Sequence, residues 1–307
     1  MKIFLILNES IGRRFLSTLN YEFIEILGIC VNKKSNDYSY FLKYSKNNCC
    51  KLFSHKNIKS KNFKIWLSKN VVDIVLNIFS YEIIPPDIIN IPKIGFFNLH
   101  PGKLPEYSGL NPVSWSILNG EKNHYVTLHW ITKKIDAGPI AYSAFSKIYK
   151  NDTAIKVFQN SVNLGLLLLH KLIKQTNIDS KKIPKIKQRI IKRKYYAKNI
   201  PNNGFINWNL KANKVYNFIR AFDYKPYNTF WLEPKIKVNN KIFQIIKVRV
   251  SKAKCNLKYG KIRVVKNKYI KISSLDKWII VLKIKYNKSY INPLEYFNNE
   301  DEIEFYN

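Results

Sequence analysis

The feature that most constrains the fold is an alternation, through the first half of the chain, of short apolar runs with polar stretches of helical length. This alternation is typical of βαβ units, which assemble a mostly parallel sheet covered by helices. The opening apolar run stops at Leu7, which is too short for a secretory leader and indicates a strand in a cytoplasmic protein. We expect buried strands within residues 2–7, 23–31, 71–79, 94–99, 125–131 and 139–145.

The second half of the chain changes its pattern twice. Capping residues at 151–153 precede a long helix whose apolar side chains recur every three or four positions as far as Ile173. A basic stretch follows, and after it a helix is expected over 211–222. Short β-rich runs then indicate a small barrel, and they span residues 236–238, 243–250, 260–265, 269–273 and 278–284.

These patterns predict an α/β fold in which a Rossmann-like, mostly parallel sheet precedes a small OB-like β-barrel. The predicted domains are a catalytic domain at 1–178, a basic linker at 179–202, a barrel at 203–290 and an acidic tail at 291–307. Ten basic side chains and one acidic side chain lie between Lys174 and Lys198. A solvated connector explains them, and so does a basic track for a phosphate-bearing acceptor.

The net charge of +33 at pH 7 points to a polyanionic partner, because clustered Lys and Arg neutralise phosphates. Yet only seven of the 53 basic residues are Arg, and a surface that grips phosphates is expected to hold more. The charge is therefore weak support for nucleic acid. No apolar run approaches the roughly 18 residues of a membrane span. The four cysteines form no pattern typical of a metal site.

Three polar residues stand where an open α/β sheet binds its ligands. Asn98 and His100 are two positions apart at the end of an apolar run, so both side chains point to the same side of the expected strand. Ligand sites lie beyond the carboxyl ends of such strands. Further along, a tight turn containing Gly138 carries the carboxylate of Asp136 between two expected strands. Spacing alone leaves a structural and a catalytic role open for all three.

The stretch from Gly95 to Tyr142 resembles the folate-dependent formyltransferase family, in particular two-domain enzymes like methionyl-tRNA formyltransferase and the related amino-sugar N-formyltransferases. The shared motifs are N-L-H at 98–100, L-P-E-Y-S-G at 104–109, N-G-E at 119–121, V-T at 126–127 and D-A-G at 136–138. Tyr125 departs from the pattern, because the family has glycine before V-T. Segments 203–208 and 216–223 resemble the C-terminal barrel of the same relatives.

The resemblance implies transfer of a formyl group from the co-substrate 10-formyltetrahydrofolate to a primary amine, with Asn98, His100 and Asp136 as catalytic residues. Asn98 and a protonated His100 would stabilise the oxyanion at the formyl oxygen. Asp136 would raise the His100 pKa and accept the amine's proton through a water, and His100 would then protonate N10. No metal is implied.

The resemblance also implies a set of contacts to the folate, made largely by backbone groups. The matching positions are Ser80, Tyr81, Glu82, Ile83, Gly102, Lys103, Leu104, Pro105, Thr132, Lys133, Lys134 and Ile135.

The amine acceptor depends on features outside these motifs. Glu106 stands in a loop where methionyl-tRNA formyltransferases usually carry arginines, and an acid there disfavours a polyanionic acceptor. This loop and the segment 223–228 look closer to relatives that formylate amino sugars on nucleotides, so an amino-sugar nucleotide or another small-molecule amine is our first expectation. The alternative acceptor is initiator methionyl-tRNA, which the two-domain length and the high positive charge of the chain favour. The alternative that is not an enzyme is a basic RNA-binding protein with an inactive core of the same fold.

Four ring-bearing side chains near these motifs are expected to be structural. His129 is expected to pack in its strand or lie on the strand surface, and His124 is expected in a solvent-exposed turn. Trp115 and Trp130 are expected in the core, with the acceptor entrance as the alternative place for Trp115.

Overall fold

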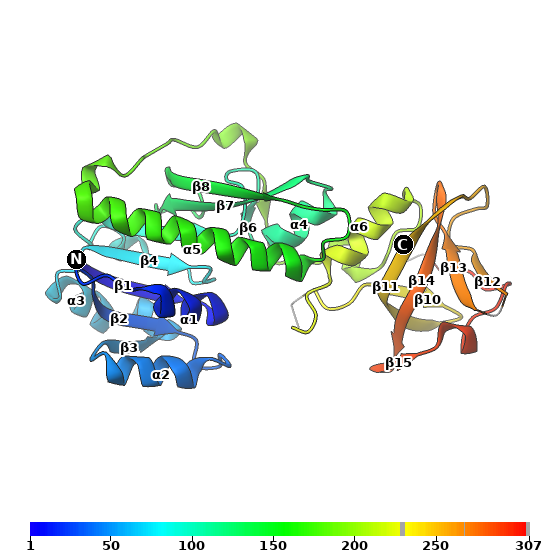
Figure 1. Cartoon of the computed structure of the whole chain (residues 1–307), viewed down its shortest axis with the longest axis horizontal. Coiled ribbons are helices and arrows are strands. Elements are labelled where there is room, and N and C mark those ends of the chain that lie inside the picture. Colours follow the sequence, from blue (N-terminus) through cyan, green and yellow to red (C-terminus); the bar gives the residue numbers. More distant parts are fainter. Residues whose placement is uncertain (228–230, 267, 305–307) are drawn as a thin grey trace. The chain divides into compact units, whose positions relative to one another are not determined.

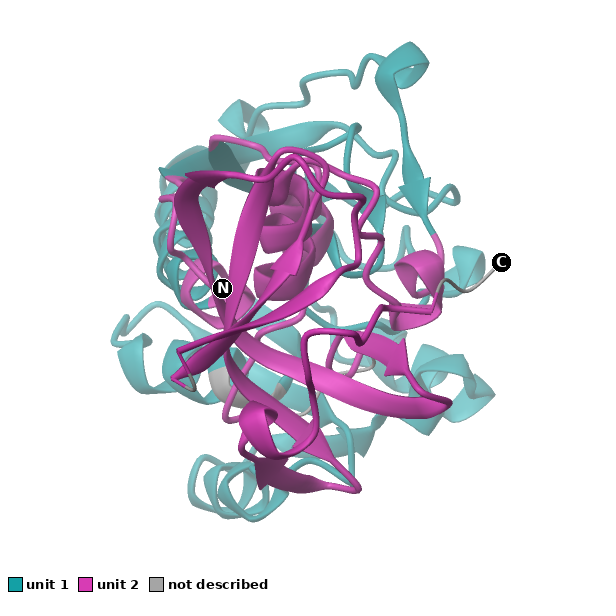
Figure 2. Cartoon of the chain, turned by 90° about the vertical axis from the view of Figure 1, so that its right-hand side faces the viewer, with its two compact units in different colours: residues 1–112, 123–146, 159–196 teal, residues 113–122, 147–158, 197–307 magenta. Residues whose placement is uncertain are grey.

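The computed structural model describes the chain over residues 1–227, 231–266 and 268–304 (Figure 1). The chain divides into two compact units (Figure 2), of which unit 1 holds residues 1–112, 123–146 and 159–196 and unit 2 holds residues 113–122, 147–158 and 197–307. These units divide the chain at other points than the predicted domain boundaries, which stay predictions. Residue 228 of the expected acceptor segment and residues 305–307 of the expected tail lie outside the described residues.

Unit 1 is built around a seven-stranded sheet with the strand order β3-β2-β1-β4-β5-β7-β8. Strands β1 to β5 pair in parallel, whereas β7 runs antiparallel to β5. The strands are β1 (Lys2–Leu7), β2 (Glu25–Val31), β3 (Lys51–Ser54), β4 (Ile74–Ile78), β5 (Gly95–His100), β7 (Asn123–Trp130) and β8 (Ile140–Lys147). The mostly parallel, Rossmann-like sheet is confirmed, and β3 is the strand that the apolar runs did not predict.

The described residues form α-helices in both units. The α-helices are α1 (Glu9–Thr18), α2 (Tyr38–Asn47), α3 (Lys61–Lys69), α4 (Pro112–Leu118), α5 (Ala154–Asp179) and α6 (Ala212–Ala221). Short 3-10 turns are η1 (His55–Lys59), η2 (Pro86–Ile88), η3 (Ser180–Lys182), η4 (Ile190–Lys192), η5 (Pro201–Gly204) and η6 (Pro293–Glu295). Among the described residues, no helix is both long enough and apolar enough to cross a lipid bilayer.

Alternate residues of the central strands bury opposite faces of the sheet. On one face, Phe4 of β1 contacts Phe63 of α3, with ring centroids 5.1 Å apart. On the other face, Gly165 of α5 lies so close to Leu99 of β5 that an added Cβ would come within 2.7 Å of that side chain. Burial on both faces explains why β1 and β4 are almost wholly apolar.

The strand order changes direction at β1, which pairs with β2 on one side and with β4 on the other. In open sheets, ligand sites lie beyond the carboxyl ends of the strands at such a point. Backbone hydrogen bonds tie these ends together, because Asn8 N–H donates to the Ile78 carbonyl at 3.2 Å and Phe79 N–H to the Leu99 carbonyl at 3.3 Å. The neighbouring strand β5 ends at this edge with His100.

Unit 2 contains an antiparallel sheet with the order β10-β11-β14-β13-β12, and β15 pairs with β14. Its strands are β10 (Lys235–Val238), β11 (Lys241–Lys254), β12 (Ile262–Val265), β13 (Tyr269–Ser273), β14 (Lys277–Tyr286) and β15 (Ser289–Ile291). Bridges join Glu304 to Lys237 of β10 and Glu302 to Lys261, the residue before β12. These bridges connect the two edge strands, as the predicted small barrel requires.

The acidic segment before residue 305 differs from the loose tail that its charge suggested. Ile303 is 4 % exposed and Asp301 is 7 % exposed. The Asp301 carboxylate accepts hydrogen bonds from the side chain of Asn239 and the backbone N–H of Asn298. The segment is therefore part of the sheet domain, because its alternate side chains are buried there and its backbone forms bridges to Lys237 and Lys261.

The basic stretch also differs from a wholly solvated connector. Residues 183–196, here called the strap, belong to unit 1. Within the strap, β9 (Tyr195–Tyr196) pairs in parallel with β6 (Ser108–Gly109), and Gln188 is buried. Most of the strap's basic side chains are exposed. The strap thus combines a hydrogen-bonded backbone with solvated cations.

We predict that Phe63→Ala lowers the free energy of unfolding by about 3–5 kcal/mol, because it removes a fully buried ring from a cluster with Phe4 and Phe53. Urea denaturation measures this change. Ile65→Ala on the same helix is the control: Ile65 is 42 % exposed, and its replacement should change the stability by no more than about 0.5 kcal/mol. Equal losses in both variants would contradict this description of the core.

Candidate active site

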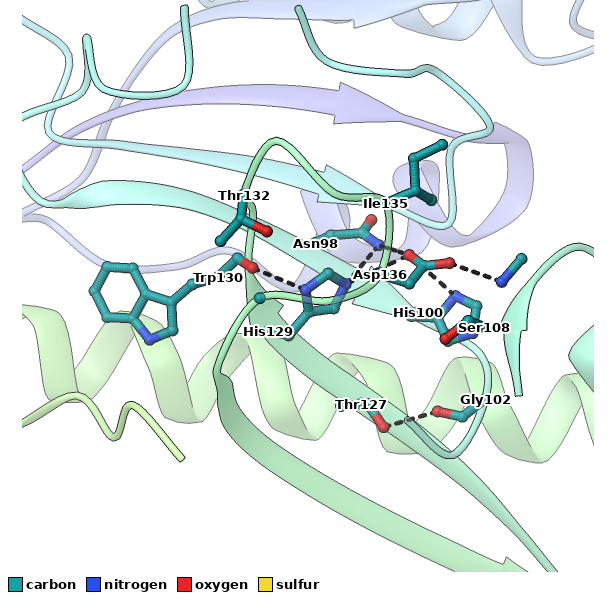
Figure 3. A network of polar contacts seen from close by, with 12 residues as sticks. Asn98, His100, Gly102, Ser108, Thr127, His129, Trp130, Thr132, Ile135 and Asp136 are labelled. Atoms are coloured by element: carbon teal, nitrogen blue, oxygen red, sulfur yellow. Dashed lines mark hydrogen bonds and ion pairs between the residues drawn. The ribbon is translucent and has the colours of Figure 1, made fainter. Parts of the chain in front are cut away.

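The carboxylate of Asp136 is the centre of a polar cluster whose side chains converge on it (Figure 3). The Asp136 side chain is 9 % exposed, and its Oδ2 accepts the backbone N–H of Gly109 at 2.8 Å. Its Oδ1 lies 3.5 Å from Nδ2 of Asn98, 3.6 Å from Nε2 of His129 and 3.9 Å from Nδ1 of His100. The structure therefore brings together the three residues that were predicted to be catalytic.

The aspartate loop, residues 132–138, directs this carboxylate through an uncommon backbone conformation. Asp136 has a φ of +51°, in the left-handed region that Asp tolerates better than most residues. Gly138 passes so close to Trp130 that a Cβ would lie 1.7 Å from the Trp130 carbonyl oxygen. Glycine is therefore required two residues after the aspartate, which gives the D-A-G motif a physical reason.

One ring nitrogen of His100 is committed to the backbone. His100 is 5 % exposed, and its Nε2 lies 2.7 Å from the carbonyl oxygen of Tyr107, which can only accept a hydrogen bond. Nε2 therefore carries a proton, and Nδ1, which faces Asp136, is the nitrogen whose protonation can change. The neutral ring presents a proton acceptor beside a carboxylate.

His129 is buried in its strand, as one of the expected alternatives, and it is also a fourth member of the cluster. It lies directly opposite Asn98 in the β5–β7 pairing, so the two side chains meet on one face of the sheet. Nδ1 of His129 donates to the Trp130 carbonyl at 2.9 Å, which leaves Nε2 to accept an amide N–H of Asn98 at 3.0 Å. The strand register is the signal that identifies His129, and the sequence does not contain it explicitly.

The charges of the cluster follow from burial and proximity. Burial lowers the pKa of His100 below its usual value and outweighs the Asp136 carboxylate, which raises it. Burial also opposes ionisation of Asp136, but the His100 and His129 rings and the Gly109 N–H together hold the Asp136 pKa well below its usual range. At neutral pH the cluster therefore contains an ionised Asp136 and a neutral His100. Asp136 thus raises the His100 pKa as expected, but its effect is smaller than that of burial.

The segments predicted to contact folate each follow a strand of the seven-stranded sheet. Residues 80–83 follow β4, residues 102–105 follow β5 and residues 132–135 follow β7. Ile83 and Ile135 are 58 % and 39 % exposed, so apolar side chains reach solvent beside these strand ends. The contacts with folate stay a prediction.

Several side chains in these segments are bound within the protein. Leu104 is 5 % exposed, and Lys103 forms an ion pair with Glu106 at 3.0 Å. The Glu82 carboxylate lies 3.0 Å from Nδ1 of His55, and the Thr132 hydroxyl donates to the Lys134 carbonyl at 3.2 Å. The backbone of these segments and their exposed side chains, among them Ile83 and Ile135, are what they can offer a ligand.

The expected exposure of His124 is wrong. β7 begins at Asn123, before the predicted start of this strand, so His124 is fully buried and burial lowers its pKa to about 3. Trp130 is half-buried, and its indole N–H donates to the Pro184 carbonyl at 2.8 Å. In unit 2, Trp115 packs edge-on against Trp231 with ring centroids 5.1 Å apart.

A hollow of about 620 Å³ lies elsewhere in unit 1, lined by Lys59, Lys64, Pro85 and Asp87 among others. Its lining shares no residue with the polar cluster, so it is not evidence for the site described here. Across residues 1–227, 231–266 and 268–304, no group of three or more His, Cys, Asp or Glu side chains is arranged to hold a metal ion.

Two protein families match the chain in order. Residues 2–169 match the family described as formyl transferase, and residues 199–301 match its C-terminal domain. The bifunctional polymyxin resistance protein ArnA of Wigglesworthia glossinidia brevipalpis is 38 % identical over 170 residues, which is 55 % of this chain and 26 % of that protein. The chain thus spans about a quarter of the length of this curated relative.

Solved structures are similar over most of the chain. WlaRD, a sugar 3N-formyl transferase crystallised in the presence of dTDP and 5-N-formyl-THF, is 25 % identical with a TM-score of 0.69, covering 92 % of this chain and 97 % of WlaRD. The N-formyltransferase from Helicobacter canadensis, in complex with folinic acid and dTDP-3-aminofucose, is 24 % identical with a TM-score of 0.68, covering 91 % and 98 %. The second likeness shows the fold alone.

We predict that Asp136→Asn moves the titration midpoint of His100 to lower pH, because the substitution removes the negative charge that favours the imidazolium. Asparagine can still accept the Gly109 N–H, so the loop is retained. Ring chemical shifts of the five histidines, followed by NMR against pH, measure the change. The His170 midpoint should stay constant, and an unchanged or higher His100 midpoint would show that the two groups do not interact as described.

Proposed function

We propose, because this chain belongs to the formyl transferase family, that it transfers a formyl group from 10-formyltetrahydrofolate to the amine of a nucleotide-linked amino sugar. The observation that carries the proposal is the buried cluster in which His100 Nδ1 and the Asp136 carboxylate are 3.9 Å apart beside an oriented Asn98 amide. A proton acceptor, a carboxylate and an N–H donor are the groups that transfer of an acyl group to an amine requires.

The residues present fit a reduced folate. Ile83 and Ile135 offer exposed apolar surface to a flat pterin, and the backbone of residues 80–83 and 132–135 offers donors and acceptors to its polar edge. When bound, the co-substrate supplies a formyl group attached to N10. WlaRD, which is similar over most of its length, was crystallised with 5-N-formyl-THF, and this supports the same class of donor here.

Asn98 is suited to stabilise the formyl oxygen. Attack by the amine on the formyl carbon places negative charge on that oxygen, and a preorganised N–H lowers the barrier. His129 accepts one Asn98 N–H at 3.0 Å and so fixes the orientation of the amide before the reaction begins. The other N–H has the longer contact, 3.5 Å to the Asp136 carboxylate, and is the donor that can turn to the formyl oxygen. Loss of one such donor costs about 100- to 1,000-fold in kcat in other enzymes.

His100 and Asp136 are suited to move the proton. The attacking amine becomes cationic as its new C–N bond forms, and the neutral His100, with Asp136 stabilising its charged form, takes up one proton from it. His100 then delivers that proton to N10 while the bond between N10 and the formyl carbon breaks. The products are a formamide on the acceptor and tetrahydrofolate, and both side chains return to their resting protonation.

Two observations favour an amino-sugar nucleotide as the acceptor. Glu106 replaces an arginine usual in methionyl-tRNA formyltransferases and pairs with Lys103, so this loop presents a neutral ion pair where phosphate binding needs cations. The similar structure WlaRD is a sugar enzyme crystallised with dTDP. The net charge of +33 favours initiator methionyl-tRNA instead, which is therefore the second candidate.

We predict that His100→Ala and Asp136→Ala each lower turnover by at least about 100-fold, because each removes one half of the proton-transfer pair. Transfer of labelled formyl from 10-formyltetrahydrofolate to a dTDP-linked amino sugar measures the effect. Lys46→Ala, at an exposed residue of α2 outside the cluster and the predicted folate contacts, is the control and should retain near wild-type kcat. Near-full turnover in a folded His100 or Asp136 variant would remove the assignment.

The same assay with two acceptors distinguishes the candidate functions. We expect formylation of the dTDP-linked amino sugar and no formylation of initiator methionyl-tRNA. Formylation of the charged tRNA alone would replace the sugar proposal with the second candidate. Tight RNA binding without any affinity for reduced folate would instead identify the chain as a non-enzymatic RNA-binding protein.

A further inference from the structure

The aspartate loop has few hydrogen bonds of its own, although it carries the central carboxylate. Within the loop, the Thr132 hydroxyl and the Ala137 N–H both donate to the Lys134 carbonyl, at 3.2 Å and 3.3 Å. Neither bond involves Asp136, whose φ of +51° is an uncommon conformation for a residue other than glycine. The conformation therefore depends on contacts from outside the loop.

The strap supplies those contacts. Nε2 of the Gln188 side chain donates to the carbonyl oxygens of Asp136 at 3.0 Å and Gly138 at 2.7 Å, so a single amide group brackets the turn. Nη2 of Arg193 donates to the carbonyl oxygen of Ile135 at 2.9 Å. The strap side chains Gln188 and Arg193 thus bind the backbone carbonyls of residues 135, 136 and 138.

The orientation of the Gln188 amide follows from its surroundings. Gln188 is 6 % exposed, and two carbonyl oxygens face one end of its side chain. Only the NH2 end can bond to them, because a side-chain oxygen placed there would be repelled. The other end, Oε1, is buried and accepts no hydrogen bond from the described residues. The side chain is therefore committed to the aspartate loop.

The strap also holds the opposite side of the carboxylate. Ser108 N–H donates to the Lys194 carbonyl at 3.0 Å and Leu110 N–H to the Tyr196 carbonyl at 2.8 Å. These bonds flank Gly109, whose own N–H donates to Oδ2 of Asp136. One segment of chain therefore fixes both the loop that carries the carboxylate and the backbone donor that receives it.

We propose that Gln188, assisted by Arg193, is a positioning residue that holds the Asp136 carboxylate against His100 and the Gly109 N–H. The expected effect on kcat rests on the proposed formyl transfer, whereas the positioning of the Asp136 carboxylate does not. A displacement of roughly 1 Å in a reacting group can cost about 100-fold in rate. Gln188 acts through Asp136 and touches neither the donor nor the acceptor in this scheme.

Gln188→Met tests the proposal, because methionine has a similar length and no N–H donor. We expect kcat to fall about 10- to 100-fold, with the KM for the acceptor changing much less. Gln175→Met is the matched control: the Gln175 side chain also donates to a backbone carbonyl, that of Asp179 at 2.9 Å, and it lies on α5 outside the cluster. The control should keep the wild-type kcat.

A readout that does not depend on activity is the NMR titration of His100 in the same variants. Asp136, His124 and His129 are the titratable groups that act on this ring. If Gln188 holds the carboxylate in place, Gln188→Met moves the His100 midpoint to lower pH, as Asp136→Asn does, whereas Gln175→Met does not. An unchanged midpoint in folded Gln188→Met would overturn the proposal.

Gln188→Glu keeps the shape of the side chain should the methionine variant fail to fold. Its ionised carboxylate would face two carbonyl oxygens, so we expect the kcat ratio to wild type to decrease as pH rises. A constant, wild-type ratio at every pH would overturn the positioning role. Absence of formyl transfer by the wild-type chain would contradict the proposed function alone, since the His100 titration tests Gln188 independently.

Discussion

The site depends on keeping one carboxylate ionised in the protein interior. A charge removed from water is stable only when donors or opposite charges surround it. For Asp136 these are the Gly109 N–H and the Asn98 amide, and the adjacent His100 ring becomes an opposite charge when it takes up a proton. Because Asn98 and His100 lie on β5 and Gly109 lies on β6, the carboxylate links separate segments of the chain. The polar cluster is therefore a stabilising contact as well as the proposed reactive centre.

The sheet explains why these groups meet. β5 is paired in parallel with β4 and antiparallel with β7, so its carboxyl end lies at the edge where parallel strands place ligands. The antiparallel pairing puts His129 opposite Asn98 and Thr127 opposite His100. Thr127 in turn donates to the Gly102 carbonyl at 2.7 Å and so fixes the start of the following loop. The geometry of the proposed catalytic site is largely a consequence of strand register.

Much of the fold was predictable because buried strands leave a clear apolar signal. The expected runs at 2–7 and 71–79 each contain a strand of the sheet, and the run at 94–99 covers all of β5 except His100. β3 was missed because its four residues are exposed or only half-buried and carry little apolar pattern. Asn98, His100 and Asp136 were identified from motifs, and their spacing alone did not show that they meet.

The remaining features depend on tertiary contacts that composition conceals. The strap has a lysine-rich sequence, yet its structural role depends on backbone pairing and on the single buried amide of Gln188. The acidic segment ending at residue 304 has a charge pattern typical of a tail, yet Ile303 is buried in the sheet domain. His100 is neutral at rest because its burial outweighs the nearby carboxylate, and the degree of burial is a property of the folded chain.

The most direct test of the central claim is a crystal structure of the chain soaked with 5-formyltetrahydrofolate. We expect the pteridine beside residues 80–83 and 132–135, with its formyl-bearing end nearest the Asn98 amide, the His100 Nδ1 and the Asp136 carboxylate. Folate bound only at a distance from these three side chains, for example in the hollow beside Lys64, would contradict the claim that they form the reactive centre.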